Sequence, residues 1–381
     1  MNFDVAIIGG SFAGLSSAYF LAKQGLNVCL FDSRKIGSFT KSTGIFTKSV
    51  MEDLAIPRKL IESEIFGVHI YSPEMREYEY RSVKPLFYQS NTISFLNWLK
   101  TKASEEGVIF FENKSCNKIE LTSNNVVIEN VNAKVSVIAS GPSISYKKSK
   151  QVLYTGLEYI AKCDVRDEHM FDVYFDYQIC PGYVAWVSPN NSDRAHIGVL
   201  LKANSGVSGI TAMKNFIKKS NLNLKKIYET RGGLVPLGET IQKTYGERSI
   251  VIGDAAGQIG AFSSAGINYS IRASKILSEV LPKYLDNPTA SNLKEYEKRW
   301  KSDFNKLLTE ESELRKIYDL ADSNQKIEKG LKILSKIPKE KILEIANNFS
   351  NLKPLNYKTS LLQVIQKALT RHFISKMMQI I

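Results

Sequence analysis

The chain has 381 residues, of which 43% are hydrophobic, and a formal net charge of +13 from 51 Lys and Arg against 38 Asp and Glu. Such a chain buries a sizeable core and divides into about two or three domains. Four scattered cysteines and four distant histidines predict neither a disulfide nor a metal site. No recognition motif accompanies the charge to indicate nucleic acid. With no apolar run of membrane-spanning length and no signal peptide, we expect a cytoplasmic protein that at most contacts the inner face of a membrane.

The first residues carry the pattern of a dinucleotide-binding unit. The expected strand, turn, helix and second strand fall at residues 4–8, 9–14, 15–24 and 27–31. Gly9 allows a tight turn, Gly14 brings the helix close to the strand, and N–H groups at the helix start face a pyrophosphate. Asp32, about twenty residues on, accepts hydrogen bonds from a ribose. Ser11 replaces the usual second glycine and still leaves room for phosphates. The alternative is an ordinary α/β unit with a glycine turn.

The predicted secondary structure changes at about residue 152, from mixed helices and strands to a run of strands. Before it we expect a Ser-, Thr- and Gly-rich loop at 37–46, helices at 50–54 and 93–106, and strands at 66–71, 108–111, 116–121 and 135–139. After it, alternating β-branched and aromatic residues predict an antiparallel sheet from 152–160, 170–177, 183–187 and 196–201, followed by a helix that includes 214–219.

A second strand-to-glycine turn comes late in the chain. Residues 231–238, marked by glycine and proline, predict a connection, and the strand at 249–252 leads into Gly253-Asp254-Ala255-Ala256-Gly257. A long helix is expected at 268–281, and the pattern beyond 293 is helical and lysine-rich. By itself Asp254 has the alternative role of a helix N-cap.

Together the two glycine turns and Asp32 resemble the p-hydroxybenzoate-hydroxylase-type flavoproteins, which bind FAD. The segment from Pro181 to Pro189 is similar to a substrate-domain motif of geranylgeranyl reductases, notably the archaeal enzymes that saturate isoprenoid chains of membrane lipids. The resemblance covers residues 1–290. It implies an α/β fold: a Rossmann-like FAD-binding domain (1–65, 86–145 and 228–290) interleaved with an antiparallel-sheet substrate domain (66–85 and 146–227). A helical C-terminal region (291–381) follows.

The resemblance also implies cofactor-binding residues for FAD. They are Gly9, Ser11, Ala13, Gly14, Asp32, Thr43, Gly44, Cys116, Gly253, Asp254, Gly266 and Ile267. Residues 9–14 would line the pyrophosphate, Asp32 the adenosine ribose, and backbone groups of Cys116 the adenine. From the residue type alone, Cys116 has the alternative of a buried small hydrophobe.

The remaining implied contacts concern the flavin end of the cofactor. Asp254 would meet the ribityl–phosphate region, Gly266 and Ile267 the edge of the isoalloxazine ring, and Thr43 and Gly44 a loop beside it. The sequence departs from the family at several positions. Thr43 occupies a position where the family often has a cysteine, and Ser140 occupies the position of the aspartate of the hydroxylases. Asn91 and Thr92 stand where the family usually has an arginine. Ala261 and Ser264 replace a proline and a glycine of the usual late turn.

Tyr183 and Trp186 are the candidate substrate-binding residues. With other aromatic residues of the predicted sheet they either line a long apolar cavity, which suits a polyprenyl chain, or pack as sheet core. The segment 367–378 has the spacing of a basic amphipathic helix, which either packs on the protein or contacts an anionic bilayer.

These features predict an FAD-dependent reductase that hydrogenates isoprenoid double bonds of a membrane lipid or prenyl precursor by hydride transfer from reduced flavin. The electron donor is open, with NAD(P)H and ferredoxin, a partner protein, as candidates. No catalytic residue or proton donor is identified. The alternatives are an FAD-dependent monooxygenase or halogenase of the same fold, and a flavin- or lipid-binding protein without turnover.

Overall fold

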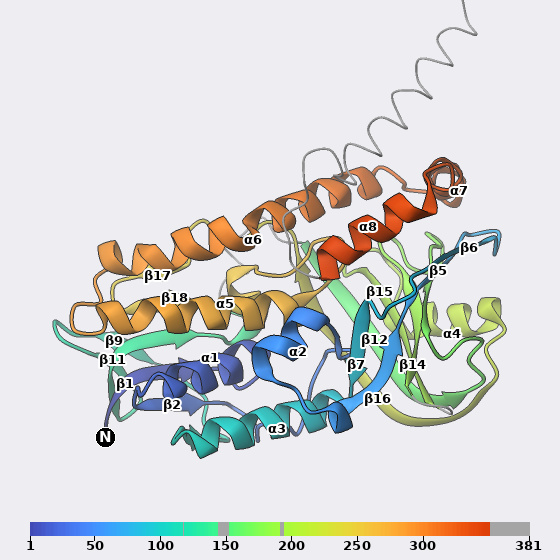
Figure 1. The fold of residues 1–381 in the computed structure, drawn as a ribbon. Coiled ribbons are helices and arrows are strands. Elements are labelled where there is room, and N and C mark those ends of the chain that lie inside the picture. The colour runs from blue at the N-terminus through green and yellow to red at the C-terminus, as the bar shows by residue number, and fades with distance from the viewer. Residues whose placement is uncertain (117, 144–151, 191–193, 351–381) are drawn as a thin grey trace, which may run out of the picture. The chain divides into compact units, whose positions relative to one another are not determined.

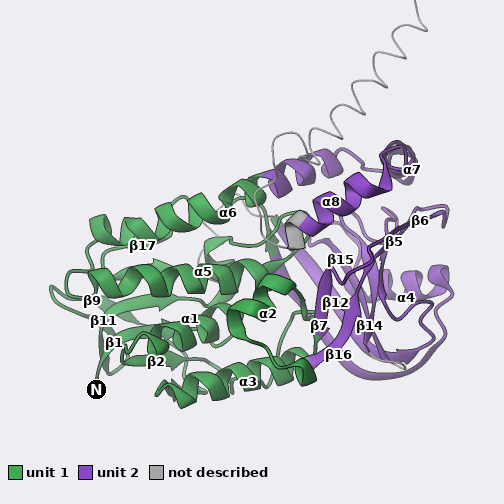
Figure 2. Cartoon of the chain, in the orientation of Figure 1, with its two compact units in different colours: residues 1–60, 90–152, 236–309 green, residues 61–89, 153–235, 310–381 purple. Residues whose placement is uncertain are grey.

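The computed structural model describes residues 1–116, 118–143, 152–190 and 194–350. The chain forms two compact units (Figure 2). Unit 1 contains Met1–Leu60, Ser90–Val152 and Pro236–Thr309, and unit 2 contains Ile61–Gln89, Leu153–Val235 and Glu310–Ile381. Each unit is therefore assembled from segments that lie far apart in the sequence.

Unit 1 is built on a mostly parallel sheet with the strand order β17-β18-β11-β1-β2-β8. Its central strands are short apolar runs buried on both faces, as is typical of parallel sheets. A hairpin of β9 and β10 pairs with β11 in antiparallel fashion. The strands are β1 (Asn2–Ile8), β2 (Val28–Phe31), β8 (Ile109–Phe111), β9 (Ile119–Leu121), β10 (Val126–Ile128), β11 (Val131–Ile138), β17 (Tyr245–Gly246) and β18 (Ser249–Val251); β3 (Ile45–Thr47) lies apart from this sheet.

Helices cover one face of the sheet, and α1 (Phe12–Lys23) packs between α3 (Thr92–Glu105) and α5 (Gly266–Val280), as Figure 1 shows. Buried serines join α1 to α5: Ser274 Oγ lies 2.8 Å from Ser16 Oγ and 2.9 Å from Ser17 Oγ. It also donates to the backbone oxygen of Ala13 at 3.0 Å. Small hydroxyl side chains thus let the two helices approach closely beside the first glycine turn. A short helix, α2 (Lys48–Leu54), also belongs to this unit.

Unit 2 is built on a seven-stranded sheet with the order β16-β12-β15-β14-β13-β5-β6. Its strands are β5 (Gly67–Tyr71), β6 (Glu77–Arg81), β12 (Val152–Cys163), β13 (Met170–Tyr174), β14 (Ala185–Asn190), β15 (Arg194–Lys202) and β16 (Leu224–Leu237). The short strands β4 (Ile61–Ile65) and β7 (Phe87–Ser90) precede and follow the β5–β6 hairpin in the chain.

The two faces of this sheet differ in chemistry. One face packs apolar residues such as Val187 and Ile197 against Met213 and Phe216 of α4 (Gly209–Ser220). Directly paired residues share a face, and Trp186 pairs with Gly198 while Ser188 pairs with His196. The face opposite α4 therefore carries an aromatic residue and a row of polar side chains.

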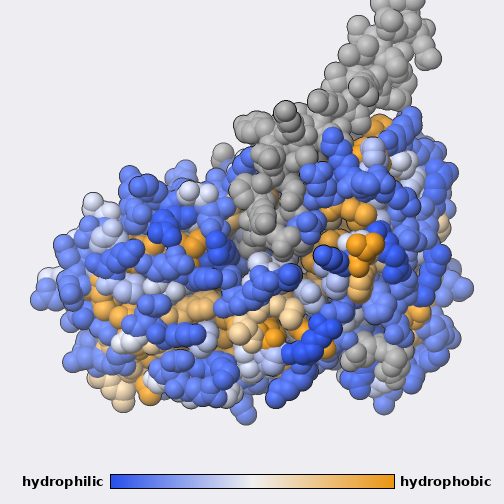
Figure 3. Space-filling view, in the orientation of Figure 1, coloured by the Kyte–Doolittle hydropathy of each residue, from blue (hydrophilic) through white to orange (hydrophobic). Residues whose placement is uncertain are grey.

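The C-terminal helices are α6 (Ala290–Asp319), α7 (Asn324–Leu334) and α8 (Lys339–Ser350). Along α6, Leu293, Tyr296, Trp300 and Phe304 are fully buried, and many of the other positions are charged. Hydrophilic side chains dominate the face drawn in Figure 3, with apolar ones between them. Among the helices that the structure describes, none has the length and apolar composition needed to cross a bilayer. The predicted tail helix at 367–378 lies outside the described residues.

The expected fold class, an α/β unit with an interleaved β-rich unit and helices toward the C-terminus, is confirmed. One local expectation is wrong. Residues 231–238 were expected to form a connection, but β16 continues through them to Leu237 as an edge strand beside β12. Another differs in part, since β5 pairs with β13 in parallel rather than antiparallel fashion.

Candidate functional site

The predicted cofactor residues gather at one edge of the sheet in unit 1. β2, β1, β11 and β18 are neighbours and run parallel, so their carboxyl ends share that edge. β1 leads into Gly9, β2 into Asp32, β11 into Ser140 and β18 into Gly253. In open α/β sheets ligands bind at this edge. The structure therefore assembles both glycine turns and the acid where a nucleotide is expected.

Close backbone approaches explain the glycines of this edge. A Cβ at Gly14 would lie 1.7 Å from the backbone oxygen of Gly9, and a Cβ at Gly253 would lie 2.7 Å from Ala13 Cβ. Gly9 and Gly253 also have φ of +107° and +69°, which other residues rarely adopt. The start of α1 therefore lies in close contact with both the first glycine turn and the late glycine turn. The positions of contact have no room for a Cβ atom.

Asp32 closes the first glycine turn. Its Oδ2 accepts a hydrogen bond from Gly10 N at 2.6 Å, and Oδ1 accepts one from Arg34 N at 2.8 Å. Ser11, the exposed N-cap of α1, makes no side-chain capping bond. First-turn N–H groups have no partner within their own helix. The N-terminus of α1 is therefore open to a phosphate, and the residues present fit the pyrophosphate of FAD.

Asp254 lies against the start of α5. A Cβ at Gly266 would be 3.2 Å from its Oδ1, and Ile267 follows in the first turn. Burial raises the pKa of Asp254 to about 6, although the nearby Lys41 ammonium opposes the rise. The carboxylate hydrogen-bonds to none of the described residues, and the short helical turn Gly253–Ala256 has Ile252 as its N-cap. Asp254 is thus held partly desolvated without a capping role.

The loop with Thr43 and Gly44 is joined to the start of α3. A Cβ at Gly44 would lie 2.4 Å from the backbone oxygen of Ser90, and Ser90 N donates to Gly44 O at 3.1 Å. Thr43 is half-buried in this loop. Asn91, at the place where the family has an arginine, caps α3 by accepting a hydrogen bond from Ser94 N at 3.0 Å. A capping side chain therefore replaces a cationic one.

Cys116 is half-buried and packs against Ala6, Cys29 and Phe31. Burial raises the pKa of its thiol to about 11, and the carboxylates of Glu129 and Asp32 add to the rise. The thiol is therefore protonated at neutral pH and is not a nucleophile. The expected contact between the backbone of Cys116 and adenine stays a prediction.

Trp186 is half-buried on the face of the unit 2 sheet opposite α4, and Gly198 makes room for its ring. A Cβ at Gly198 would lie 2.0 Å from the indole. The Nε1 of Trp186 is buried and has no hydrogen-bond partner among the described residues. Buried donors without partners are rare in native proteins.

We expect Gly198→Ala to destabilise the protein by about 1–3 kcal/mol, because the indole must leave its place. The free energy of unfolding, measured with urea, checks this. Gly156→Ala on β12 is the matched control, since a Cβ there would meet Leu200 only at 3.5 Å. Equal losses in the two variants would contradict the account of Trp186 packing.

Tyr183 is buried in a different environment. Its ring meets Tyr154 edge-on at 5.7 Å, and the guanidinium of Arg315 lies 5.0 Å from the ring centroid. Tyr318 Oη donates to the backbone oxygen of Tyr183 at 2.8 Å. These contacts are those of a packed core, while a substrate contact of Tyr183 or Trp186 stays a prediction. One pocket of unit 2 is lined by Tyr174, Cys180 and Phe216 among others, and neither Tyr183 nor Trp186 is among its lining residues.

A buried polar cluster that the sequence did not predict lies on the same sheet face as Trp186. Glu158 Oε1 lies 3.0 Å from His196 Nδ1, and Asn190 Nδ2 lies 3.3 Å from His196 Nε2. All three residues are at most 5% exposed. Glu62 of β4 lies near the cluster: burial raises the pKa of its carboxyl group, and His196 and Asn190 are among the groups that oppose the rise. The signal in the sequence was Glu158, a charged residue within the strand predicted at 152–160.

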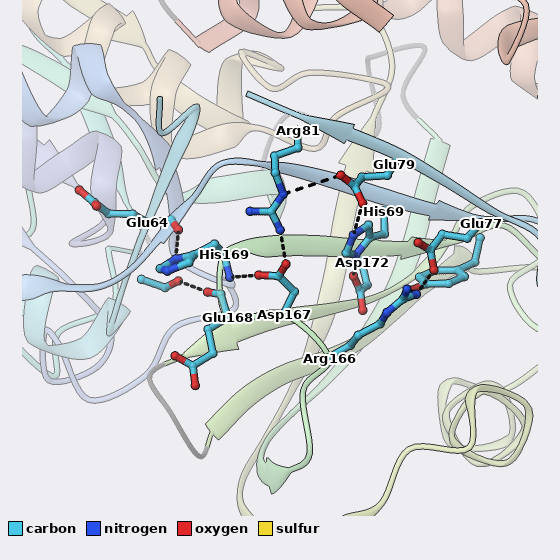
Figure 4. Close-up of polar contacts among 12 residues, drawn as sticks. Glu64, His69, Glu77, Glu79, Arg81, Arg166, Asp167, Glu168, His169 and Asp172 are labelled. Atoms are coloured by element: carbon cyan, nitrogen blue, oxygen red, sulfur yellow. Dashed lines mark hydrogen bonds and ion pairs between the residues drawn. The ribbon is translucent and has the colours of Figure 1, made fainter. Parts of the chain in front are cut away.

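A second polar cluster lies at the β6 edge of the sheet (Figure 4). His69 Nδ1 is 2.8 Å from Asp172 Oδ1, and Nε2 is 3.7 Å from Glu79 Oε2. Arginines partner the outer carboxylates: Arg166 with Glu77, and Arg81 with Glu79 at 3.8 Å. His69, Glu77 and Glu79 are close enough to one another to ligate one ion. The arginines, however, already supply positive charge to the two glutamates. We therefore assign the cluster a structural role, which is to hold β5, β6 and β13 together.

Asp172→Ala is expected to cost about 1–3 kcal/mol of stability, because it leaves Nδ1 of the buried His69 without a partner. Asp172→Asn keeps an acceptor and should lose less. Thermal or urea unfolding of both variants at neutral pH measures the difference. Identical losses would show that the carboxyl–imidazole hydrogen bond contributes little.

The sequence comparisons agree with this geometry. Residues 4–78 match the family described as FAD dependent oxidoreductase. The chain is 27% identical to digeranylgeranylglycerophospholipid reductase 2 of Methanothermobacter thermautotrophicus, over 92% of this chain and 98% of that protein. It is 24% identical to digeranylgeranylglycerophospholipid reductase of Methanocaldococcus jannaschii, over 83% and 87%.

Solved structures show the same fold. A geranylgeranyl bacteriochlorophyll reductase-like protein from Thermoplasma acidophilum superposes with a TM-score of 0.82 at 19% identity, covering 96% of this chain and 98% of that one. The flavin-dependent brominase Bmp2 superposes with a TM-score of 0.73 at 15% identity, covering 98% and 100%. Both likenesses concern the fold alone.

The chain is therefore an FAD-dependent oxidoreductase, with FAD as the cofactor that the edge of the unit 1 sheet accommodates. Over most of its length the chain is similar, at 24% and 27% identity, to proteins named digeranylgeranylglycerophospholipid reductase.

Proposed function

We propose that the protein hydrogenates the double bonds of geranylgeranyl chains carried by a lipid or a prenyl precursor. The observation that supports this most is the length of the match to digeranylgeranylglycerophospholipid reductase 2, because it covers 98% of that protein. Both units, and not only the nucleotide-binding segment, are thus shared with a reductase of that name. The brominase shares the fold at 15% identity, so it does not favour the halogenase alternative.

Each part of the chain has a role in this reaction. Bound FAD, once reduced, supplies a hydride. The start of α1 with Gly9, Gly14 and Gly253 holds the pyrophosphate, and Asp32 holds the adenosine ribose. Asp254, Thr43, Gly44, Gly266 and Ile267 line the flavin end. The shared edge of the sheet and the close approaches described above support these assignments.

The sheet face of unit 2 that carries Trp186 is the proposed binding surface for the isoprenoid chain. An aromatic ring offers a prenyl chain apolar contact and few competing hydrogen bonds. The electron donor, NAD(P)H or a ferredoxin-like protein, and contact with the inner face of a membrane remain proposals of the same kind.

Product analysis tests the proposal. Chemically reduced protein is incubated without oxygen with a lipid that bears geranylgeranyl chains, and the lipid is analysed by mass spectrometry. We expect the mass to rise in steps of two hydrogens. Parallel incubations with dioxygen, and with dioxygen and bromide, separate the alternatives: a gain of oxygen or of bromine instead of hydrogen would replace the reductase by a monooxygenase or a halogenase.

A further inference from the structure

The late glycine turn of unit 1 is held by the buried side chain of Gln258. Its Oε1 accepts a hydrogen bond from Gly253 N at 2.8 Å, and its backbone N donates to Gly253 O at 3.0 Å. Both backbone polar groups of Gly253 are therefore bonded to the same residue. Because Gln258 is fully buried, removal of its amide would leave the N–H of Gly253 unpaired away from water.

The amide of Gln258 is fixed in one orientation. A backbone N–H can only donate, so the amide oxygen faces Gly253 and the amide nitrogen points elsewhere. That nitrogen, Nε2, donates to Tyr296 Oη at 3.2 Å. Burial raises the pKa of Tyr296 above its usual value, so the hydroxyl group stays neutral. Tyr296 therefore holds the side chain of Gln258 against Gly253.

Tyr296 belongs to α6, a helix of the C-terminal region that the sequence did not connect with the cofactor. It is fully buried, and its neighbours on α6 bind Thr244. Glu297 Oε2 accepts from Thr244 N at 2.8 Å, and Trp300 Nε1 donates to Thr244 Oγ1 at 2.9 Å. Thr244 O in turn accepts from Val251 N at 2.8 Å, at the end of β18. All of these residues belong to unit 1, so this part of α6 supports both the last strand and the turn that follows it.

Gly253 is also the point where the turn meets α1 and α5. A Cβ at Gly253 would lie 2.7 Å from Ala13 Cβ in α1 and 3.2 Å from Ser270 Oγ in α5. The next residue along the turn is Asp254, whose carboxylate is proposed to meet FAD. A displacement of Gly253 would therefore disturb the first turn of α1 and the position of Asp254 together.

We propose that Gln258 and Tyr296 are positioning residues for FAD, which hold Gly253 and Asp254 in the conformation that the bound cofactor requires. This inference rests on the FAD contacts assigned under the proposed function, and it does not depend on the substrate. Neither residue needs to touch FAD, because each acts through the late glycine turn. A turn that is already ordered costs less to bind, so FAD affinity is higher.

Gln258→Met and Tyr296→Phe test the proposal. Methionine has a similar size and makes neither hydrogen bond of the amide, whereas phenylalanine removes only the acceptor for Gln258. Flavin fluorescence titration of protein from which FAD has been removed measures affinity, and urea unfolding without FAD measures stability. We expect FAD affinity to fall about tenfold or more in Gln258→Met and about threefold to tenfold in Tyr296→Phe, because binding must then order the turn.

Tyr318→Phe is the matched control. Tyr318 lies on the same helix, but its hydroxyl donates to the backbone oxygen of Tyr183 in unit 2 at 2.8 Å. Each of the two Tyr→Phe variants therefore removes one hydroxyl group that makes a hydrogen bond. We expect Tyr318→Phe to lose stability and keep the FAD affinity of the wild type. A purely structural role of Tyr296 would lower stability in both variants and affinity in neither.

The outcomes separate this inference from the assigned FAD site and from the reductase activity. If Gln258→Met and Tyr296→Phe bind FAD as tightly as the wild type, the two residues serve the fold alone and the proposal is wrong. If Gly253→Ala also binds FAD normally, the assignment of the late turn to FAD is itself wrong. If Gln258→Met does not fold, the milder Tyr296→Phe decides. No lipid enters these measurements, so their result holds whatever the substrate is.

Discussion

A Gly14→Ala variant should lose FAD almost completely. The added Cβ would lie 1.7 Å from the backbone oxygen of Gly9, and neither atom can be moved by rotating a side chain. α1 must therefore shift away from β1. It is also joined to α5 through Ser274, so the shift displaces the N–H groups that face the pyrophosphate.

We expect FAD affinity to fall at least about 100-fold, which corresponds to about 2.7 kcal/mol, with a further loss of stability of about 1–3 kcal/mol from overpacking. Flavin fluorescence titration and urea unfolding measure the two effects. Gly25→Ala after the same helix is the control. A Cβ there meets no atom within 4 Å, but φ is +82°, so it should cost about 1–2 kcal/mol of stability and leave FAD affinity unchanged. FAD affinity within threefold of the wild type in Gly14→Ala would contradict the assigned site.

Asp254→Asn should stabilise the protein from which FAD has been removed. The folded-state pKa of about 6 lies above the ordinary value of 3.8. The folded protein therefore holds this proton more tightly than the unfolded chain, and stability falls as pH rises from about 4 to about 6. The rise in pKa from 3.8 to about 6 corresponds to about 3 kcal/mol at most. Asparagine removes this cost at neutral pH.

The same variant should bind FAD more weakly, by about tenfold or more, because it loses the carboxylate proposed to meet the ribityl–phosphate region. Unfolding by urea at pH 4 and pH 7, with and without FAD, separates the two effects. The variant and the wild type should have nearly equal stability at pH 4 and differ at pH 7. A variant that is less stable at pH 7 without FAD would show that the carboxylate serves the fold rather than the cofactor.

The nucleotide-binding part of the fold could be predicted because its signals are local. The glycine turn, α1 and β2 follow one another within about thirty residues, and each has its own residue pattern. The strand β16 could not be predicted in the same way. Gly232, Gly233 and Pro236 are turn signals by composition, but pairing with β12 over a long edge outweighs them.

The polar cluster of unit 2 could not be predicted because distant segments assemble it. Glu62 precedes Asn190 by more than a hundred residues, and only the register of β12, β14 and β15 brings Glu158, Asn190 and His196 onto one face. In the sequence each of them is an isolated polar residue. Tyr183 illustrates the opposite case: its motif was visible, but its neighbours Tyr154 and Arg315 became known only from the structure.

The most direct test of the central claim is anaerobic oxidation of the reduced flavin by a lipid. Purified protein is reduced chemically and mixed either with a geranylgeranyl lipid or with the same lipid already saturated, and the flavin absorbance is followed. We expect rapid oxidation by the unsaturated lipid and none by the saturated one. A flavin that stays reduced with both lipids, and is oxidised only when oxygen is admitted, would contradict it.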